Sequence, residues 1–550
     1  VMEVLIPFIT AMIIDQGIEA GNMKKVGLYG SIMLVFAMFS LLFGVLAGKY
    51  GANASSGLAC NLRDAMYENI QTFSFSNIDK YSTAGLVTRM TTDVTNVQNA
   101  YQMILRIAVR APFTLICSMI MCFVVNAKLS LIFVIAIIVL GAFIVVVVKT
   151  TMKIFDMVFK KYDALNASVQ ENVSAIRVVK AFVREDYEVK KFHGISQYVY
   201  NLFTKAEKIV AWNSPVMQFV MYTVVILLVL IGGKSIIGGQ METGELTSII
   251  VYALQIIGSL MMVTFVFVMI MIAQASTDRI TEVLEEVPEM QDKENAVKTV
   301  DNGEIVFNHV NFSYAGEGGN LSLKDINLHI KSGQTIGIIG GTGSAKSTLV
   351  QLIPRLYDVT GGQVKVGGVD VRDYDLKALR DQVSMVLQKN VLFTGTIYDN
   401  IRWGDKDASE EEVKRVCRLA QADGFVQEFP DGYNTQIVQG GNNVSGGQKQ
   451  RLCIARALLK KPKILILDDS TSAVDTKTDA LIRKAFREEI PDTTKIIIAQ
   501  RISSIEDADQ IIVLDDGKVM GVGTSEELLK TNDIYREVYE SQVKGGGEDE

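Results

Sequence analysis

The sequence contains few of the residues that build small secreted or metal-binding domains. Its 550 residues include only five Cys, three His, eight Pro and two Trp. The cysteines show no metal-ligand spacing and are too sparse for a disulfide framework, so we expect them to be reduced. With a net charge of −7 and no basic stripe interleaved with aromatic residues, the chain is not expected to bind nucleic acid.

Long apolar runs are concentrated in the first half of the chain. Apolar residues make up 49% of the sequence, and the mean hydropathy of +0.25 is too high for a typical soluble protein and too low for a chain of membrane spans alone. A chain of this length exceeds what one hydrophobic core organises. We predict a transmembrane domain over 1–287, a linker over 288–300, a soluble domain over 301–541 and a flexible acidic tail over 542–550.

Six segments of the first domain are apolar enough to cross about 30 Å of hydrocarbon as helices, the first of them truncated at its start. They are Val1–Ile14, Val26–Ala47, Ile104–Val125, Leu129–Val148, Ser214–Ile231 and Leu246–Ala273. This domain is therefore expected to be all-α, with six spans.

Charge in the connections indicates their side of the membrane, because short cytoplasmic loops collect Lys and Arg. The loops near Asp15–Lys25, Asn126–Lys128 and Gly232–Glu245 carry few positive charges and are expected to face outward. The long, charged connections 48–103 and 149–213 keep a helical composition and are expected to extend into the cytoplasm. Their turns, near Phe73–Tyr81 and Arg177–Tyr187, either dock on the soluble domain or are solvated helix tips.

Arg106 and Arg110 lie four residues apart on one face of the third predicted span. Two interpretations are open for this pair. The guanidinium groups either attract an anionic substrate or extend toward the lipid headgroups.

A phosphate-binding loop is predicted near the start of the soluble domain. The run Ile336–Ile339 leads into GGTGSAKST, followed by a helix expected to start near Leu349. Strand, glycine-rich turn and helix form the context of an ATP-binding P-loop, whose backbone N–H groups face the phosphates. The predicted contacts are Gly340, Gly341, Thr342, Gly343, Ser344, Ala345, Lys346, Ser347 and Thr348.

Two of these side chains have distinct expected roles. Lys346 would bridge the outer phosphates of ATP, and the Ser347 hydroxyl would hold Mg²⁺. Ala345 stands where this motif usually has Gly. The Ala345 methyl group weakens ATP binding if the position needs a glycine conformation, and costs nothing if it already lies in the helix.

Two further motifs complete the pattern: the strand-like run ILILD at Ile464–Asp468 and VSGGQKQR at Val444–Arg451. With them the chain resembles an ABC transporter of the exporter type over nearly its whole length. The resemblance implies a six-helix membrane exporter domain with long cytoplasmic helical extensions, followed by an α/β P-loop ABC nucleotide-binding domain that uses ATP and Mg²⁺.

The resemblance also assigns expected roles to individual residues. Tyr314 would stack on adenine, Asp468 would face the Mg²⁺ site, and Gln388 would contact Mg²⁺ and the γ-phosphate. Ser472–Asp475 would touch the opposite nucleotide-binding domain. In this family each ATP lies between two such domains, so the signature residues would complete the ATP site of a partner chain: Ser445, Gly446, Gly447 and Gln448.

The sequence departs from the family pattern at two expected catalytic positions. Asp469 stands where the family has a Glu that positions the attacking water, and its side chain is shorter by about 1 Å, a misplacement that can slow a reaction about a hundredfold. Gln500 stands where the family has a His. An amide donates a hydrogen bond but cannot carry a proton as imidazole does.

These departures resemble the degenerate subunit of heterodimeric bacterial multidrug exporters. We expect a multi-pass cell-membrane protein, in contact with lipids and with its nucleotide-binding domain in the cytoplasm, that moves drugs or other amphiphilic cargo. The expected partner is a second half-transporter that has the catalytic Glu and His and performs most of the ATP hydrolysis. Two alternatives stay open: a homodimeric lipid or peptide exporter, and an ATP-gated channel or regulator.

Overall fold

The computed structural model describes residues 2–316, 318–470 and 472–545. The chain forms two compact units. The helical unit comprises residues 1–70 and 84–285, and the α/β unit comprises residues 71–83 and 286–550. A short segment from within the predicted membrane domain therefore belongs to the α/β unit.

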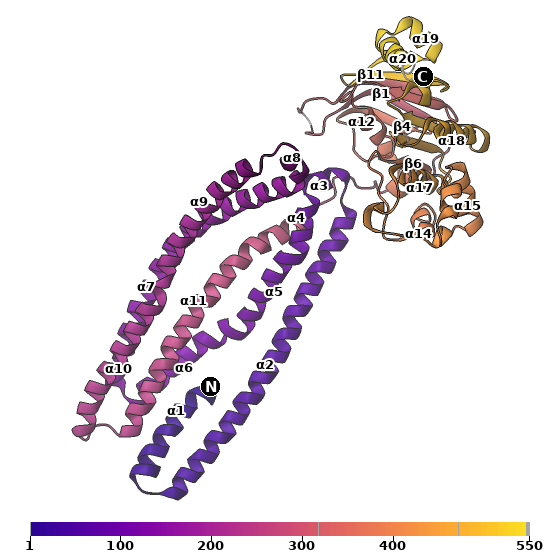
Figure 1. Ribbon diagram of the computed structural model, residues 1–550. Coiled ribbons are helices and arrows are strands. Elements are labelled where there is room, and N and C mark those ends of the chain that lie inside the picture. The colour runs from indigo at the N-terminus through magenta and orange to yellow at the C-terminus, as the bar shows by residue number, and fades with distance from the viewer. Residues whose placement is uncertain (1, 317, 471, 546–550) are drawn as a thin grey trace. The chain divides into compact units, whose positions relative to one another are not determined.

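The helical unit consists of long helices interrupted by short turns and by π-helical turns (Figure 1). Its elements are α1 (Met2–Ile13), η1 (Ile14–Glu19), α2 (Met23–Thr72), α4 (Thr83–Thr88), η2 (Arg89–Asp93), α5 (Val94–Met103), η3 (Ile104–Ala108), α6 (Arg110–Val125), α7 (Ala127–Ser174), α8 (Ile176–Ala181), α9 (Glu185–Ala211), α10 (Asn213–Ile237) and α11 (Thr243–Glu285).

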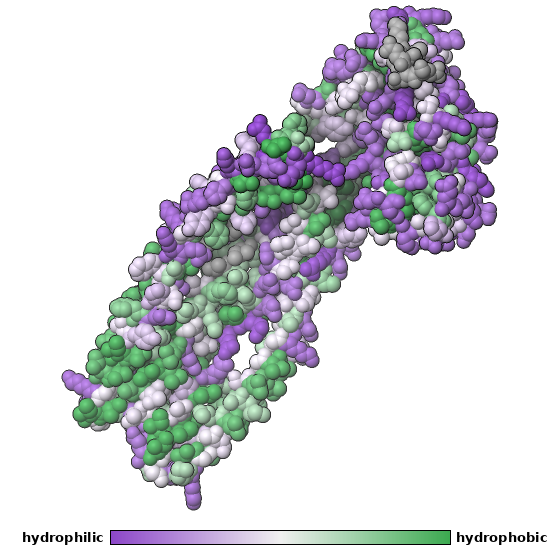
Figure 2. Space-filling model, viewed as in Figure 1, coloured by the Kyte–Doolittle hydropathy of each residue, from purple (hydrophilic) through white to green (hydrophobic). Residues whose placement is uncertain are grey.

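Five of the six predicted spans lie within helical stretches that are long and apolar enough to cross a membrane. These stretches are Met23–Thr72, Thr83–Val125, Ala127–Ile154, Glu185–Ile237 and Thr243–Glu285. The first predicted span corresponds to α1, a helix of 12 residues. Figure 2 shows hydrophobic side chains over the outer surfaces of α2 and α10, as expected for helices that face lipid.

Helix α11 provides much of the apolar core of the helical unit. Its buried residues Ile249, Tyr252, Ala253 and Ile256 belong to a cluster with side chains of α1, α6, α7 and α10. The Tyr252 hydroxyl donates a hydrogen bond to the carbonyl oxygen of Val4 at 2.8 Å. This bond satisfies a polar group that would otherwise be costly in an apolar interior.

Both long connections are helical, as predicted. The first turns at α3 (Phe75–Lys80), and the second turns at α8. In the second connection, α7 and α9 pack through the buried residues Ile154, Val158 and Ala206.

Arg110 forms an ion pair, which neither interpretation of the arginines predicted. Its guanidinium donates to the carboxylate of Glu3 on α1 at 2.5 and 2.7 Å. The Ser40 hydroxyl donates to the same carboxylate at 3.3 Å. The charge of Arg110 is therefore balanced within the helical unit, between α1 and α6.

The α/β unit contains a four-stranded sheet, a six-stranded sheet and a two-stranded ribbon. Its strands are β1 (Ile305–Phe312), β2 (Leu323–Ile330), β3 (Thr335–Ile339), β4 (Gly361–Val366), β5 (Val369–Asp370), β6 (Val383–Val386), β7 (Gly395–Thr396), β8 (Gln436–Ile437), β9 (Ile464–Asp468), β10 (Thr494–Ile498), β11 (Gln510–Asp515) and β12 (Lys518–Gly523). The remaining helical elements are α12 (Lys346–Gln351), η4 (Val371–Asp373), α13 (Leu376–Gln382), α14 (Ile397–Ile401), α15 (Glu410–Leu419), α16 (Asp423–Glu428), η5 (Gly432–Asn434), η6 (Gln439–Gly441), α17 (Gly446–Leu459), α18 (Thr476–Glu489), η7 (Ile502–Ser504), α19 (Ser525–Thr531) and α20 (Asp533–Gly545).

The six-stranded sheet has the order β12-β11-β3-β10-β9-β6, with only β12 antiparallel to its neighbour. Strand β9 is buried along its whole length, as the run ILILD predicts, because a parallel strand is covered on both faces. The carboxyl ends of β3, β9 and β10 meet at one edge of the sheet. Ligands of open α/β sheets bind at such edges.

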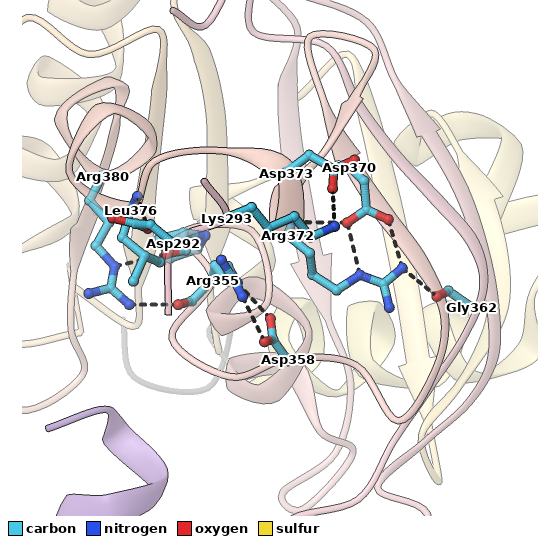
Figure 3. Close-up of polar contacts among 11 residues, drawn as sticks. Asp292, Lys293, Arg355, Asp358, Gly362, Asp370, Arg372, Asp373, Leu376 and Arg380 are labelled. Atoms are coloured by element: carbon cyan, nitrogen blue, oxygen red, sulfur yellow. Dashed lines mark hydrogen bonds and ion pairs between the residues drawn. The ribbon is translucent and has the colours of Figure 1, made fainter. Parts of the chain in front are cut away.

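The predicted linker is fixed to the α/β unit. Lys293 forms an ion pair with Asp373, and the Leu376 amide donates to Asp292 at 2.9 Å (Figure 3). Val297 also forms a β-bridge with Tyr374. The segment is therefore part of the folded α/β unit and not a free tether.

Helix α3, at the first predicted docking turn, packs within the α/β unit. The Phe75 ring lies edge-on to the Tyr357 ring with centroids 6.0 Å apart. The Tyr357 hydroxyl donates to Asp79 at 2.6 Å. Docking of the turn Phe73–Tyr81 is thus confirmed, whereas docking of Arg177–Tyr187 stays a prediction.

The boundary of the predicted acidic tail is wrong by a few residues. Helix α20 extends to Gly545, and the Gln542 side chain is hydrogen-bonded to η7 and the residues before it. Helix packing therefore includes 542–545 in the folded unit. Residues 546–550 lie outside the described residues.

Candidate nucleotide-binding site

A cavity of about 740 Å³ lies at the carboxyl ends of β3, β9 and β10. Its wall includes all of the residues predicted for this chain's own ATP site: Tyr314, Gly340, Gly341, Thr342, Gly343, Ser344, Ala345, Lys346, Ser347, Thr348, Gln388, Asp468, Asp469 and Gln500. The fold thus brings together residues separated by up to 186 positions, as a parallel sheet does with its loops.

The loop after β3 is packed closely against the neighbouring strand β11. A Cβ atom at Gly340 would lie 2.1 Å from the Leu514 carbonyl oxygen, so only Gly fits there. The Lys346 ammonium donates to the carbonyl oxygens of Gly340 and Gly341, each at 2.8 Å. Burial lowers the Lys346 pKa, and the nearby carboxylates of Asp468 and Asp469 oppose that shift.

Ala345 adopts the left-handed conformation, with φ 69° and ψ 28°. Helix α12 begins at Lys346, three residues before the predicted start near Leu349, and Ala345 is its N-cap. The structure thus decides between the two possibilities for this residue. The left-handed conformation costs residues other than Gly, Asn and Asp about 1–2 kcal/mol of conformational free energy, so the loop is strained at Ala345.

Ser347 and Asp468 provide oxygen atoms suited to Mg²⁺. The Ser347 hydroxyl donates to Asp468 Oδ1 at 3.0 Å. Burial raises the Asp468 pKa, and the hydrogen bond from Ser347 opposes this. Hydroxyl and carboxylate oxygens are ligands that Mg²⁺ accepts, usually together with water and phosphate oxygens.

These residues fit a Mg²⁺ site shared with nucleotide phosphates better than a site made of protein ligands alone. Within the described parts of the chain, no group of three or more His, Cys, Asp or Glu side chains is placed to hold a metal. Phosphate oxygens would therefore complete the coordination, and Gln388 lies on the same cavity wall.

Asp469 and Gln500 form a direct pair. The Gln500 amide Nε2 donates to Asp469 Oδ2 at 2.7 Å. Asp469 has φ 50°, a left-handed conformation that Asp tolerates better than most residues. Burial raises the Asp469 pKa, and the hydrogen bond from Gln500 is the strongest opposing influence. One carboxylate oxygen of Asp469 is therefore engaged by the amide.

Tyr314 stands at the rim of the cavity with 55% of its surface exposed. Its hydroxyl lies 3.1 Å from the Thr348 hydroxyl. Its ring is nearly perpendicular to the rings of Phe312 and Tyr357, at 82° and 87°. These contacts hold an exposed aromatic ring next to the P-loop.

The signature residues lie outside the cavity wall. Ser445 is the N-cap of α17 and forms a capping box with Gln448, whose backbone amide donates to the Ser445 hydroxyl at 3.3 Å. A Cβ atom at Gly447 would lie 2.8 Å from the Ala473 carbonyl oxygen, so this position needs Gly. Ser445 and Gly446 are exposed. Their expected role in the ATP site of a partner chain stays a prediction.

The cavity wall also contains residues that the sequence analysis missed: Leu321, Ser322, Ile339, Ile498, Asp516, Gly517 and Val538. Asp516 and Gly517 form the turn after β11, where Asp516 pairs with Lys324 at 2.7 Å. The apolar run before the dipeptide Asp516–Gly517 could have identified this turn at the same sheet edge. No sequence signal indicated that Val538 of α20 reaches the site.

Two family models match the chain. The model described as the ABC transporter transmembrane region matches residues 1–260, and the one described as ABC transporter matches residues 323–472. The chain is 37% identical over 541 residues to the uncharacterized ABC transporter ATP-binding protein YfiB of Bacillus subtilis, covering 98% of this chain and 94% of that protein.

A further relative and one solved structure extend this comparison. The chain is 34% identical over 514 residues to an ATP-dependent lipid A-core flippase of Desulfotalea psychrophila, covering 93% of this chain and 89% of the flippase. The structure of a bacterial Atm1-family ABC exporter with ATP bound matches with a TM-score of 0.83. That match covers 98% of this chain and 96% of the other at 23% identity, so it shows a common fold.

Both parts of the chain match their family models, and relatives align over nearly its full length. The protein is a multi-pass membrane protein of the ABC transporter family, a bacterial-type exporter half-transporter with its transmembrane region and its ATPase domain on one chain.

Proposed function

We propose that this half-transporter is the subunit of a heterodimeric exporter whose own ATP site binds nucleotide but hydrolyses it slowly. The hydrogen bond of 2.7 Å between Gln500 and Asp469 carries this proposal. The general function, ATP-driven export by paired half-transporters, follows from the family. The asymmetry between the two ATP sites is the part that we propose.

Slow hydrolysis follows from the chemistry of the pair. A water molecule that attacks the γ-phosphate must be held in line with the bond that breaks and must transfer a proton to a base. The Asp469 carboxylate is short and already accepts a hydrogen bond from Gln500. Gln500 cannot accept and pass on a proton at neutral pH.

Nucleotide binding is supported by the intact parts of the site. Lys346, Ser347 and Asp468 line one cavity together with the exposed ring of Tyr314. Mg²⁺, when bound, neutralises phosphate charge, and Ser347 with Asp468 would hold it. The left-handed conformation of Ala345 is expected to reduce this affinity, since Gly adopts it freely and Ala does not.

The intact signature supports a role in the active site of another chain. Ser445 and Gly446 are exposed at the N-terminus of α17, where backbone N–H groups favour phosphate. We propose a partner half-transporter with Glu and His in place of Asp469 and Gln500, and with a damaged signature. The proposed cargo is a drug or another amphiphilic compound.

A second candidate is a homodimeric lipid exporter. The likeness to a protein named ATP-dependent lipid A-core flippase favours it. In this candidate two copies of Asp469 would both support slow turnover.

The two candidates are separated by purification and ATPase assays. The protein would be tagged, extracted with its complex from its native membrane, and compared with the chain expressed alone. We expect a second half-transporter in the complex, little ATPase from the single chain, and one nucleotide retained per complex after a single turnover. Brisk turnover by the chain alone would contradict the slow own site, and a native complex without a second half-transporter would favour the homodimer.

The matched variants are Asp469→Glu, Gln500→His and the two combined. Only the combination is expected to raise hydrolysis in the chain's own site, because it restores both the base and the proton-carrying group; the rise is partial, since the partner's damaged signature is unchanged. Full recovery with Asp469→Glu alone would show that Gln500 is not limiting.

A further inference from the structure

Helix α20 contacts the nucleotide cavity through one face. Val538 lines the cavity, and Gln542 lies four residues later on the same side of the helix. The helix is anchored by Tyr535, which is fully buried and whose hydroxyl lies 2.9 Å from that of Ser525. Gln542 therefore extends from a firmly packed element.

The Gln542 side chain binds the backbone on both sides of Arg501. Its Nε2 donates to the Gln500 carbonyl oxygen at 2.8 Å, and its Oε1 accepts from the Ile502 amide at 2.8 Å. An amide group is needed for this arrangement, because it offers one donor and one acceptor side by side.

Gln500 and Arg501 lie between two buried residues, Ala499, whose amide donates to the Ile338 carbonyl oxygen at 3.3 Å, and Ile502. Strand β10 ends at Ile498, and η7 begins at Ile502. Gln500 itself is exposed, so packing does not hold its side chain in place. On the far side, the Ser504 hydroxyl donates to the buried Asp479 at 2.9 Å.

We infer that Gln542 is a positioning residue for the ATP site, which holds the backbone at Gln500 so that the Gln500 amide reaches Asp469. This inference rests on the proposed function and extends it, in that the Gln500 amide on the cavity wall beside Asp469 also slows the release of bound nucleotide. Helix α20 therefore helps to set how long this site keeps ATP. Gln542 acts through Gln500 and does not itself touch the nucleotide.

A double-mutant cycle tests this inference on the full-length complex purified from its membrane. The variants are Gln500→Ala, Gln542→Met and both together, and the measurement is the release rate of a fluorescent ATP analogue with Mg²⁺. Met has nearly the shape of Gln but makes neither hydrogen bond. Loss of about one net hydrogen bond corresponds to roughly fivefold faster release.

The expected result is that Gln542→Met speeds release about fivefold in the wild-type background and has no effect once Gln500 is Ala. An equal effect in both backgrounds would show a purely structural role and overturn the inference. No effect of Gln542→Met, while Gln500→Ala speeds release, would overturn the inference and leave the proposed function standing. No effect of Gln500→Ala on release would also overturn the inference and leave the proposed slow hydrolysis standing.

Two further variants control for misfolding in this experiment. Gln542→Glu keeps the acceptor for the Ile502 amide but places a carboxylate against the Gln500 carbonyl oxygen, so it should also speed release. Glu537→Gln changes an exposed residue of the same helix and should change nothing. If Gln542→Met fails to fold, the same cycle with Gln542→Glu decides the question.

Discussion

At the scale of single residues, the ATP site carries backbone strain at Ala345. Its left-handed conformation is one that Gly adopts freely. We expect Ala345→Gly to stabilise the α/β unit by about 0.5–1 kcal/mol and to tighten ATP binding severalfold. Thermal unfolding and nucleotide titration of the full chain measure the two effects. Weaker ATP binding by the Gly variant would contradict this prediction.

The two adjacent carboxylates of the site make stability depend on pH. Burial raises the pKa values of Asp468 and Asp469 above the usual 3.8. The folded state therefore holds these protons more tightly than the unfolded state, and the stability they contribute is lost as pH rises through the raised pKa values.

Asp469→Asn removes one of these titrations and keeps an acceptor for the Gln500 amide. Without nucleotide, we expect the variant to unfold at a higher temperature than the wild type at pH 7.5. At pH values below 3.8 the difference should vanish, because Asp469 is then protonated in both states. An equal difference at both pH values would show that ionisation is not its cause.

At the scale of elements, the helical unit contains a buried ion pair between η2 and α11. Asp93 is fully buried, and its carboxylate accepts from the Arg279 guanidinium at 2.8 and 2.5 Å and from the Ser276 hydroxyl at 2.9 Å.

Removing the Asp93 side chain takes away the carboxylate that both the Arg279 guanidinium and the Ser276 hydroxyl bind. We expect Asp93→Ala to destabilise the helical unit by about 3 kcal/mol, at the lower end of values for buried pairs because the Arg279 side chain is 47% exposed. The control is Lys180→Ala, which breaks an exposed pair with Glu185 and should cost less than about 1 kcal/mol. Thermal unfolding in detergent compares the two, and equal costs would contradict the prediction.

At the scale of the whole molecule, the α/β unit includes a short segment that interrupts the helical unit in the sequence. Residues 71–83 leave the helical unit and fold with the α/β unit, where α3 contacts Tyr357. The proposed partnership with a second half-transporter also belongs to this scale. The signature at Ser445 lies apart from the chain's own cavity, so a single chain does not complete either proposed ATP site.

Local patterns were sufficient to predict much of the fold. Hydrophobic runs of span length identified five long membrane helices, because a bilayer demands an uninterrupted apolar helix. The P-loop, the buried strand before Asp469 and the signature were recognisable because each depends on a short stretch of neighbouring residues. The residues predicted from these patterns line one cavity, and their roles toward ATP stay predictions.

Properties that depend on distant residues were decided only by the tertiary structure. The conformation of Ala345 depends on how the loop packs beneath β11, and the ion pair of Arg110 depends on α1 lying beside α6. The contact of Gln542 with the backbone at Gln500 joins residues 42 positions apart. The sequence by itself determined which chemical groups the ATP site contains. The packing of distant elements decided which backbone is strained, which side chains pair, and which residues hold the site in place.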